Sequence, residues 1–380
     1  MSVAKKATKM SEGVTDDGYR CHHIVTERDT PLSHRIRYRT RRTSLSTFRP
    51  CQGDPIFLVP EMYEEQIQQK TPVSDVRTWD AEMRPDGEPD EIIAEIVTEL
   101  GLSDANRVLF DNTMQARFTH DLQTHIDAEF GLSEEVLWSF RIQKDSTELT
   151  KLRRSVTIAD QVATEIRQMG SDVVGMAESE LASEIESRLE DTGGDGLPYE
   201  IVVASGPNGA TPHHSSGERI IRAGEPVILD FGTLVDGYSS DQSRTLIFGS
   251  EDGQNKAEPS EKFEVIHDTV RRAQQAAVDT VEPGIPAKNV DRTAREVIED
   301  AGYGDRFVHR TGHGVGLELR EDPFITPSNE MELKEGMVFS VEPGIYLEGE
   351  FGVRIEDLVV VTKDGCERLN HSDRGWRTGI

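Results

Sequence analysis

Five side chains that could bind metal ions stand on short, separate motifs in the last third of the 380-residue chain. They are Asp230 in VILDFG, Asp241 in YSSDQSRT, His313 in HRTGHGVG, Glu342 in SVEPGIY and Glu356 in GVRIEDLVV. In a chain this rich in Asp and Glu, the simplest interpretation of any one acid is a solvated surface charge. That interpretation is weaker for Asp230, Glu342 and Glu356, because they interrupt apolar runs in which an unpaired charge is costly to bury.

Converging carboxylates would determine the chemistry of such a site. Four carboxylates without counter-charge would repel one another, and several would have to stay protonated. Two divalent cations would balance the charge, with His313 as a neutral ligand. Oxygen-rich ligation with one imidazole suits manganese, which we expect here, and also cobalt, zinc or iron. Because paired metals activate water and polarise a carbonyl, the set predicts hydrolysis.

The chain between the two aspartates has the pattern of a hairpin. Asp236-Gly237 separates two β-type runs, which is the usual signal for a two-residue turn. If Val235 and Tyr238 flank this turn, Asp241 lies opposite Gly232. Gly232 lies on the same strand face as Asp230, because side chains alternate along a strand. Asp230 and Asp241 are then diagonal neighbours across the two strands. Their carboxylates can approach each other over Gly232, which has no side chain.

A second pair of strands is expected to carry the two glutamates. MVFSVEPG presents Glu342, and GVRIEDLVVV presents Arg354 and Glu356 on one face. The glycines of TGHGVG favour a strand or loop at His313 over a helix.

These motifs together resemble the pita-bread metallopeptidases, in particular the proline-directed branch that contains prolidase and aminopeptidase P. The resemblance covers roughly residues 143–370. It implies that one metal ion binds Asp230, Asp241 and Glu356. It also implies that the second ion binds Asp241, His313, Glu342 and Glu356, so that Asp241 and Glu356 bridge the pair.

The resemblance also assigns roles around the metals. It implies that His213 in TPHHSSG stabilises the tetrahedral intermediate, that Glu342 transfers a proton, and that His309 lies in the substrate pocket. Tyr346 and Arg354 match positions near the metals and substrate. From the residues alone, His213-His214 could equally be an exposed loop, and Arg354 a partner for buried carboxylates.

One position departs from the family pattern. Active proline-directed members carry a histidine seven residues after the metal-binding one, whereas LELRE places Arg320 there. Arginine is a permanent donor and cannot accept a proton near neutral pH. Arg320 is therefore expected to stabilise an oxyanion or to bind an acidic group of the substrate.

The expected function is that of a metal-dependent exopeptidase that hydrolyses Xaa-Pro bonds near the N-terminus of peptides or in dipeptides. A pita-bread hydrolase of a non-peptide C–N bond is one alternative, which the retention of all five ligands disfavours. A metal-binding homologue without catalysis is another, and Arg320 is the residue that favours it. The family resemblance also implies a homodimer.

Strand and helix patterns predict the α+β class in two domains. Residues 53–142 alternate strands (55–60, 107–111) with helices, which indicates a small α/β domain. Residues 143–380 begin with a capping-box-like Asp145 and Glu148 and are expected to form the pita-bread domain, a curved antiparallel sheet covered by helices.

The first 52 residues are anomalous. They hold eleven Lys and Arg against five Asp and Glu, although the whole chain has a net charge of −28. Three interpretations remain open: a basic interaction arm, a disordered terminus, or a mistranslated reading frame in place of the first strand and helix of the N-terminal domain.

Composition excludes some partners. The net charge of −28 argues against nucleic acid and anionic membranes. Three cysteines without a disulfide pattern indicate a reducing compartment, and neither a secretory signal nor a membrane span is expected, so we predict a cytoplasmic protein. The acidic, lysine-poor chain resembles salt-adapted proteins; an acidic protein without salt adaptation is the alternative.

Overall fold

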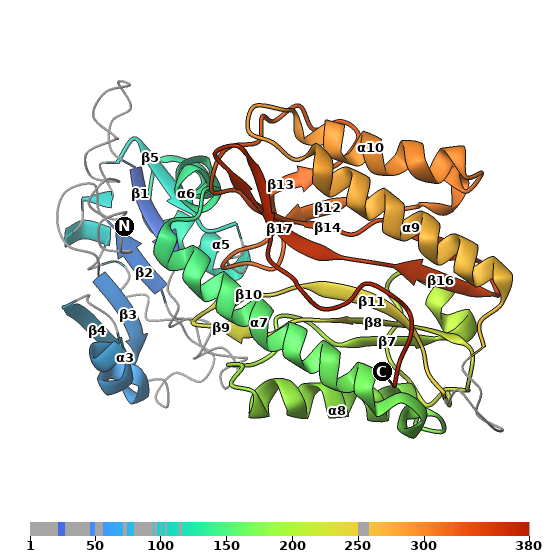
Figure 1. Cartoon of the computed structure of the whole chain (residues 1–380). Coiled ribbons are helices and arrows are strands. Elements are labelled where there is room, and N and C mark those ends of the chain that lie inside the picture. The colour runs from blue at the N-terminus through green and yellow to red at the C-terminus, as the bar shows by residue number, and fades with distance from the viewer. Residues whose placement is uncertain are drawn as a thin grey trace. The chain divides into compact units, whose positions relative to one another are not determined.

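A computed structural model describes two compact units, Met1–Phe140 and Arg141–Ile380 (Figure 1). The residues described are 22–26, 46–49, 56–70, 74–79, 94, 97–99, 101–102, 105–112, 114, 116–249 and 258–379. The sequence predicts the boundary near residue 142. None of the helices in these ranges combines the length and apolarity that a membrane span requires.

The first unit contains a mixed sheet whose strands follow the order β4-β3-β2-β1-β5-β6. β1 is parallel to β5, β5 to β6 and β3 to β4, whereas β2 is antiparallel to both of its neighbours. The elements are β1 (His22–Thr26), β2 (Ser46–Arg49), β3 (Ile56–Pro60), η1 (Glu61–Tyr63), α3 (Glu64–Lys70), β4 (Asp75–Trp79), β5 (Arg107–Phe110), α5 (Ala116–His125), β6 (Glu129–Leu132) and α6 (Glu134–Arg141). Apolar residues of β3, β5 and α5 pack together in its core.

Two of these strands come from the anomalous basic segment. β1 and β2 supply residues 22–26 and 46–49, and β1 joins the antiparallel β2 to the parallel β5. The rest of residues 1–52 lies outside the described residues, so the three interpretations of the segment stay predictions.

The second unit opens with two helices, α7 (Ser146–Met169) and α8 (Glu178–Asp191). Asp145 accepts hydrogen bonds from the backbone of Thr147 and Glu148, and the Glu148 side chain accepts from the backbone of Asp145, which confirms the predicted capping box. α7 ends where Gly170 adopts φ 52°. Its buried stripe packs against α8 and the strands that carry the aspartates.

The remaining elements form small antiparallel sheets and a second pair of helices. α7 and α8 lie on the side of β7, β8 and β11, whereas α9 and α10 lie on the side of β12, β13 and β14 (Figure 1). The elements are β7 (Val202–Ser205), η4 (Gly206–Ala210), β8 (Pro226–Phe231), β9 (Leu234–Val235), β10 (Tyr238–Ser239), β11 (Gln242–Ile247), α9 (Glu261–Thr280), α10 (Ala287–Asp300), β12 (Gly312–Gly314), β13 (Glu321–Ile325), β14 (Val338–Val341), β15 (Gly344–Leu347), β16 (Phe351–Arg354), β17 (Asp357–Thr362) and β18 (Gly365–Arg368).

The predicted hairpin register is confirmed. Tyr238 pairs with Val235, and the same register continues to Gln242 opposite Phe231 and Ser243 opposite Asp230. The turn needs two residues with positive φ, and Asp236 and Gly237 adopt 50° and 84°. A Cβ on Gly232 would collide with the carbonyl oxygen of Ser240, so the strands at the aspartates come together only because this residue is glycine.

The glutamate-bearing strands differ from the expectation in one respect. β14 pairs with β17, with Val341 opposite Asp357, and with β12 on its other side. The residues that precede β17 form a separate strand, β16, that pairs with β15. GVRIEDLVVV is therefore two strands in two sheets. Glu342 directly follows β14 and Glu356 directly precedes β17, so both glutamates stand at the same end of this strand pair.

Candidate metal centre and active site

A cavity of about 260 Å³ in the second unit brings together the predicted metal ligands. Asp230, Asp241, His313, Glu342 and Glu356 all line it. So do four of the predicted catalytic and substrate residues: His213, His309, Arg320 and Arg354. Tyr346 does not line the cavity; it is buried, and its hydroxyl is hydrogen-bonded to two residues that do, His309 and Arg354.

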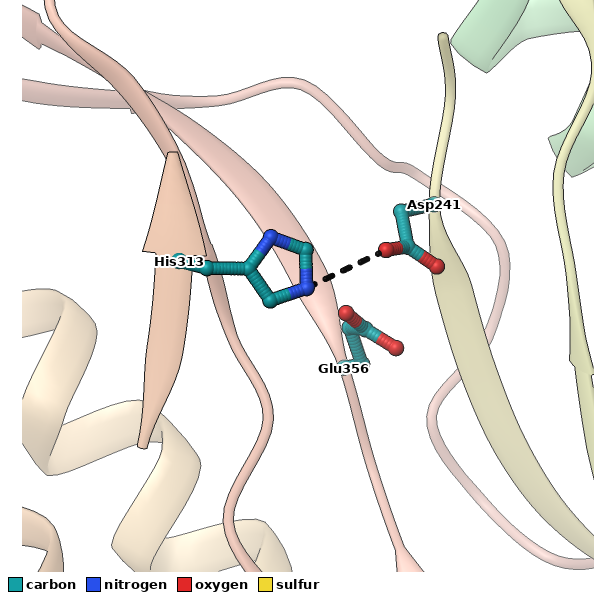
Figure 2. A group of neighbouring side chains, drawn as sticks. All are labelled: Asp241, His313 and Glu356. Carbon is teal, nitrogen blue, oxygen red and sulfur yellow. Dashed lines mark ion pairs between the residues drawn. The ribbon is translucent and has the colours of Figure 1, made fainter. Parts of the chain in front are cut away.

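Three of the ligands converge closely. Asp241 follows β10, His313 lies in β12 and Glu356 precedes β17, and their side chains point toward one another (Figure 2). One ligand atom from each lies within 4.8 Å of the others. His313 Nε2 is 3.6 Å from Asp241 Oδ2 and 3.5 Å from Glu342 Oε1. This spacing leaves room for an ion between them.

The tautomer of His313 suits a ligand. Its Nδ1 lies 3.1 Å from the carbonyl oxygen of Gly314, and a carbonyl can only accept, so Nδ1 carries the hydrogen. The lone pair of Nε2 then faces the carboxylates. Burial lowers the pKa of His313 to about 4, which keeps the imidazole neutral near neutral pH.

The carboxylates raise one another's pKa values. Burial and then the charge of Asp230 raise the pKa of Asp241 well above its usual range. Burial and then Asp241 do the same for Glu356. For Glu342, burial and Asp230 outweigh the opposing effect of Arg354 and raise the pKa to about 7. Protein groups alone therefore do not neutralise this cluster.

The carboxylate of Glu356 gives the clearest indication of a cation site. Its Oε2 accepts a 2.8 Å hydrogen bond from Ser243 Oγ, whereas its Oε1 is buried and has no hydrogen-bond partner among the described residues. A buried carboxylate oxygen without a donor is costly, and a cation would satisfy it. Together with the bare nitrogen of His313 and the adjacent acids, this orphan oxygen fits divalent metal ions.

Arg354 is paired with one ligand. Its Nη2 donates to Asp230 Oδ2 at 2.7 Å, its Nε to Ser243 Oγ at 2.8 Å, and its Nη1 to the hydroxyl of Tyr346 at 2.9 Å. Arg354 is therefore the partner of a carboxylate, that of Asp230, and it lies at the wall of the cavity.

His309 lies at the end of the same chain of hydrogen bonds. Its Nδ1 lies 2.7 Å from the carbonyl oxygen of Arg310 and must donate to it, so Nε2 accepts from the hydroxyl of Tyr346 at 2.8 Å. Burial, and then the charge of Arg354, lower the pKa of His309 to about 4. Both ring nitrogens are thus engaged within the protein, although the ring lines the cavity.

Sequence reasoning missed Tyr199, which precedes β7. Its hydroxyl lies 2.7 Å from Asp230 Oδ1 and 2.5 Å from Asp241 Oδ1, so it bridges the two aspartates. Burial, and then both carboxylates, raise the pKa of this phenol well above its usual range, so it remains a donor. A single tyrosine in a loop has no spacing pattern, so no sequence signal pointed to it.

His213 and His214 have different surroundings. His213 lines the cavity and forms no hydrogen bond to a described residue; desolvation, and then the charges of Arg320 and Arg354, lower its pKa. His214 Nε2 lies 2.8 Å from the buried carboxylate of Glu178, which also accepts from Ser205 and Asn208. Glu178, also missed by the sequence reasoning, thereby holds the loop that presents His213.

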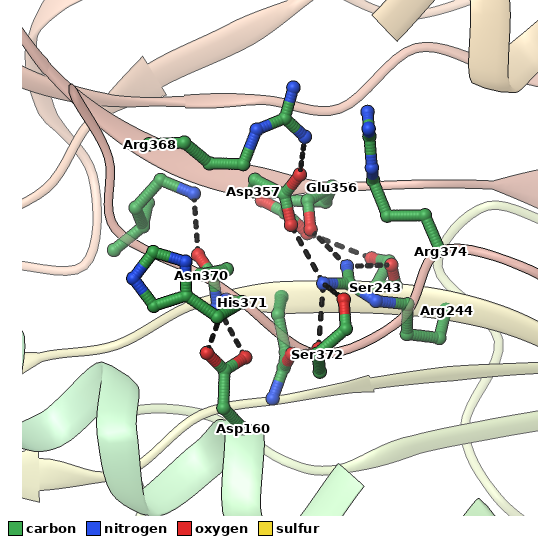
Figure 3. Close-up of polar contacts among 12 residues, drawn as sticks. Asp160, Ser243, Arg244, Glu356, Asp357, Arg368, Asn370, His371, Ser372 and Arg374 are labelled. Atoms are coloured by element: carbon green, nitrogen blue, oxygen red, sulfur yellow. Dashed lines mark hydrogen bonds and ion pairs between the residues drawn. The ribbon is translucent and has the colours of Figure 1, made fainter. Parts of the chain in front are cut away.

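An ionic network supports the ligand strands from behind. Side chains alternate along the chain, so Ser243 and Glu356 face the cage while their neighbours Arg244 and Asp357 face the opposite side. Figure 3 shows the polar contacts of Arg244 and Asp357. Arg244 donates to the carbonyl oxygen of Glu356 at 2.6 Å and to Asp357 Oδ1 at 2.7 Å. Asp357 Oδ2 accepts from Arg368 and, at 3.0 Å, from Gln274.

Comparison with known proteins places the chain in a family. Residues 150–363, more than half of the sequence, match the profile of metallopeptidase family M24. The chain belongs to this family. Membership in a metallopeptidase family implies divalent metal ions, in agreement with the cage described above.

Solved structures of this family share the fold over nearly the whole chain. A dipeptidase from Pyrococcus horikoshii OT3 is 36% identical, covers 97% of this chain and 99% of its own, and superposes with a TM-score of 0.84. A prolidase from Thermococcus sibiricus is 32% identical, with 100% and 99% coverage and a TM-score of 0.88. These likenesses confirm the predicted α+β class and pita-bread fold.

Curated relatives match over a shorter range. The Xaa-Pro dipeptidase of Lactobacillus delbrueckii subsp. lactis is 40% identical over 237 residues, which is 62% of this chain and 61% of that protein. The Xaa-Pro dipeptidase of Pyrococcus furiosus is 38% identical over 247 residues, 65% of this chain and 68% of that protein. The match to the Lactobacillus protein thus spans less than two thirds of that relative.

Proposed function

We propose that this chain is a dinuclear metallopeptidase that hydrolyses Xaa-Pro bonds, in dipeptides or near the N-terminus of peptides. The observation that carries the proposal is the buried Oε1 of Glu356, which lies inside a cage of acids and has no hydrogen-bond partner in the described part of the chain. Relatives named Xaa-Pro dipeptidase and prolidase support the substrate class.

Two ions would bind Asp230, Asp241, His313, Glu342 and Glu356, with Asp241 and Glu356 shared. Bound there, divalent cations would lower the pKa of a water molecule and polarise the scissile carbonyl. Manganese suits the oxygen-rich donor set. The family resemblance further supports a homodimer, and the cysteine content supports a cytoplasmic location.

The protein's own groups would handle protons and position the substrate. Glu342 lines the cavity beside the other proposed ligands, and its carboxylate can accept a proton from the attacking water and return it to the leaving nitrogen. His213 lines the cavity without a hydrogen bond to any residue that the structure describes, and when neutral it can donate its N–H to the oxygen of the tetrahedral intermediate.

Arg354, Tyr346 and His309 would act by positioning. The hydrogen bonds from Arg354 to Tyr346 and from Tyr346 to His309 fix the wall beside Asp230. Because both nitrogens of His309 are already bonded, it would shape the pocket and orient Tyr346 in this state.

The test is a peptide panel with defined metals. Protein loaded with Mn²⁺, Co²⁺ or Zn²⁺ is incubated with Ala-Pro, Ala-Pro-Ala and Ala-Ala in high and low salt, and released amino acids are quantified. We expect hydrolysis of the proline peptides that is lost in Glu342→Gln. Metal-loaded protein that cleaves no peptide would refute the proposal and leave the non-peptide or non-catalytic alternatives.

A further inference from the structure

Residues 370–379, here called the strap, follow β18 and contact helices on both sides of the second unit. On α7, Arg167 donates to three carbonyl oxygens of the strap at 2.5–2.7 Å. Asp160, also on α7, accepts hydrogen bonds from two strap residues (Figure 3). On α9, the ring of Phe263 meets that of Trp376 edge to face, with centroids 6.2 Å apart. The strap is thus bonded to one helix and packed against the other.

One strap residue, Ser372, reaches the strand between the two groups of proposed metal ligands. Its hydroxyl accepts a 2.7 Å hydrogen bond from Arg244 Nη2 and donates to Gln242 Oε1 at 3.0 Å. Its carbonyl oxygen also accepts from Arg244 Nη2, at 3.1 Å. Gln242 and Arg244 lie in β11 and are only 0% and 2% exposed. A single hydroxyl therefore links the strap to two buried side chains.

These two partners adjoin the ligands that the proposed function shares between both ions. Gln242 directly follows Asp241 in the chain. Arg244 donates to the carbonyl oxygen of Glu356 at 2.6 Å (Figure 3). Ser372 thus contacts the residue next to one shared ligand and the arginine that bonds the other. Partners behind metal ligands orient them and raise the affinity for the metal.

The Ser372 hydroxyl has no ready substitute among the described residues. Nε2 of Gln242 and Nε of Arg244 are buried and already lack a hydrogen-bond partner in this part of the chain. Loss of the hydroxyl would also remove the donor to Gln242 Oε1 and one acceptor of Arg244. Because buried polar groups without partners are costly, we expect both side chains to shift toward other partners and to move the neighbouring ligands with them.

We propose, resting on the metal-dependent function above, that Ser372 is a positioning residue for the metal cage and couples the strap to metal binding. The contacts with α7 and α9 fix the strap, and the strap fixes Ser372. Ser372 in turn fixes Gln242 and Arg244, which hold the two shared ligands in place. Coupling between two sites is reciprocal. Metal binding should therefore order the strap, and loss of the Ser372 contact should weaken metal binding.

The first measurement is the Mn²⁺ affinity of the metal-free full chain, by isothermal titration calorimetry. We expect Ser372→Ala to bind Mn²⁺ about 3- to 10-fold more weakly than wild type. Ser372→Thr, which keeps a hydroxyl, should restore most of the affinity. Thr378→Ala is the matched control, because the Thr378 hydroxyl donates at 2.7 Å to the carbonyl oxygen of Ile247. It also loses a strap hydrogen bond, but it should bind Mn²⁺ as wild type does.

Hydrogen–deuterium exchange measures the coupling in the reverse direction. The backbone N–H groups of His371 and Gly379 donate to α7, so their exchange reports the order of the strap. In wild type, Mn²⁺ should slow this exchange by the same factor, about 3- to 10-fold, and in Ser372→Ala the effect should be lost. Residues 284–288, whose amides donate to residues 329–333, are the reference segment and should be slowed less.

Three results would overturn the proposal: wild-type Mn²⁺ affinity in Ser372→Ala, an equal loss of affinity in Thr378→Ala, or exchange of the strap that Mn²⁺ leaves unchanged. Failure of the proposed function gives a different result. Wild type itself then binds no Mn²⁺, no variant differs from it, and the coupling is refuted together with the metal cage.

Discussion

Asp357→Asn is expected to destabilise the second unit, Arg141–Ile380, although the substitution keeps the size of the side chain. The side chains of Asp357 and Arg244 are 0% and 3% exposed, so solvent does not screen their interaction. The variant leaves the guanidinium groups of Arg244 and Arg368 without the carboxylate that accepts their hydrogen bonds. It also turns the amide NH₂ group of the new side chain toward these N–H donors. Removing one member of a buried pair costs about 3–5 kcal/mol.

This cost has a measurable size. One kcal/mol lowers the melting temperature by about 2–4 °C in a unit of 150–250 residues, so we expect a decrease of roughly 6–20 °C. Circular dichroism melting of metal-free protein would measure it at fixed salt. Asp268→Asn is the control, because Asp268 and its partner Arg271 are 50% and 45% exposed and such pairs contribute only about 0–1 kcal/mol.

The same substitution should also weaken metal binding. Arg244 donates to both Asp357 and the carbonyl oxygen of Glu356, so loss of Asp357 should loosen Glu356, a proposed metal ligand. Supporting contacts of this kind typically change metal affinity by about 10- to 100-fold. If Asp357→Asn melts within the range of Asp268→Asn and binds Mn²⁺ as wild type does, the network does not support the cage.

Three further substitutions test the site. Tyr199→Phe removes the hydroxyl between Asp230 and Asp241 and should weaken Mn²⁺ binding about 10-fold in a metal titration; unchanged affinity would contradict a supporting role. Gly232→Ala places a Cβ against the Ser240 carbonyl and should lower both melting temperature and metal content, and a fully stable, metal-loaded variant would argue against the hairpin geometry. Burial opposes ionisation of Glu178, but hydrogen bonds from Ser205, His214 and Asn208 outweigh it and lower the pKa of Glu178 below its ordinary 4.5. Its contribution to stability is therefore present above pH 4.5 and lost as the pH falls through the lowered value, so melting of Glu178→Gln should be less sensitive to acid than that of wild type.

Local rules were sufficient for much of this fold. The Asp236-Gly237 turn, with its period-two alternation, gave the register that pairs Ser243 with Asp230. Asp145 and Glu148 marked the start of α7 because capping depends only on adjacent residues. These features depend on short-range geometry, which the sequence displays directly.

Features that depend on tertiary contacts could not be predicted from the sequence. Tyr199 and Glu178 have no motif, and their roles follow from donors and acceptors contributed by other elements. The division of GVRIEDLVVV into β16 and β17 depends on which strands pair with each half. The engagement of His309 by Tyr346 likewise becomes visible only when residues far apart in the sequence are brought together.

Metal stoichiometry tests the central claim most directly. Protein dialysed against Mn²⁺ is analysed by inductively coupled plasma mass spectrometry beside Glu356→Gln, which alters a ligand proposed to be shared by both ions. We predict two ions per wild-type chain and a loss of both in the variant. A wild-type chain that binds no divalent ion, or a Glu356→Gln chain that binds as many ions as wild type, would contradict the account.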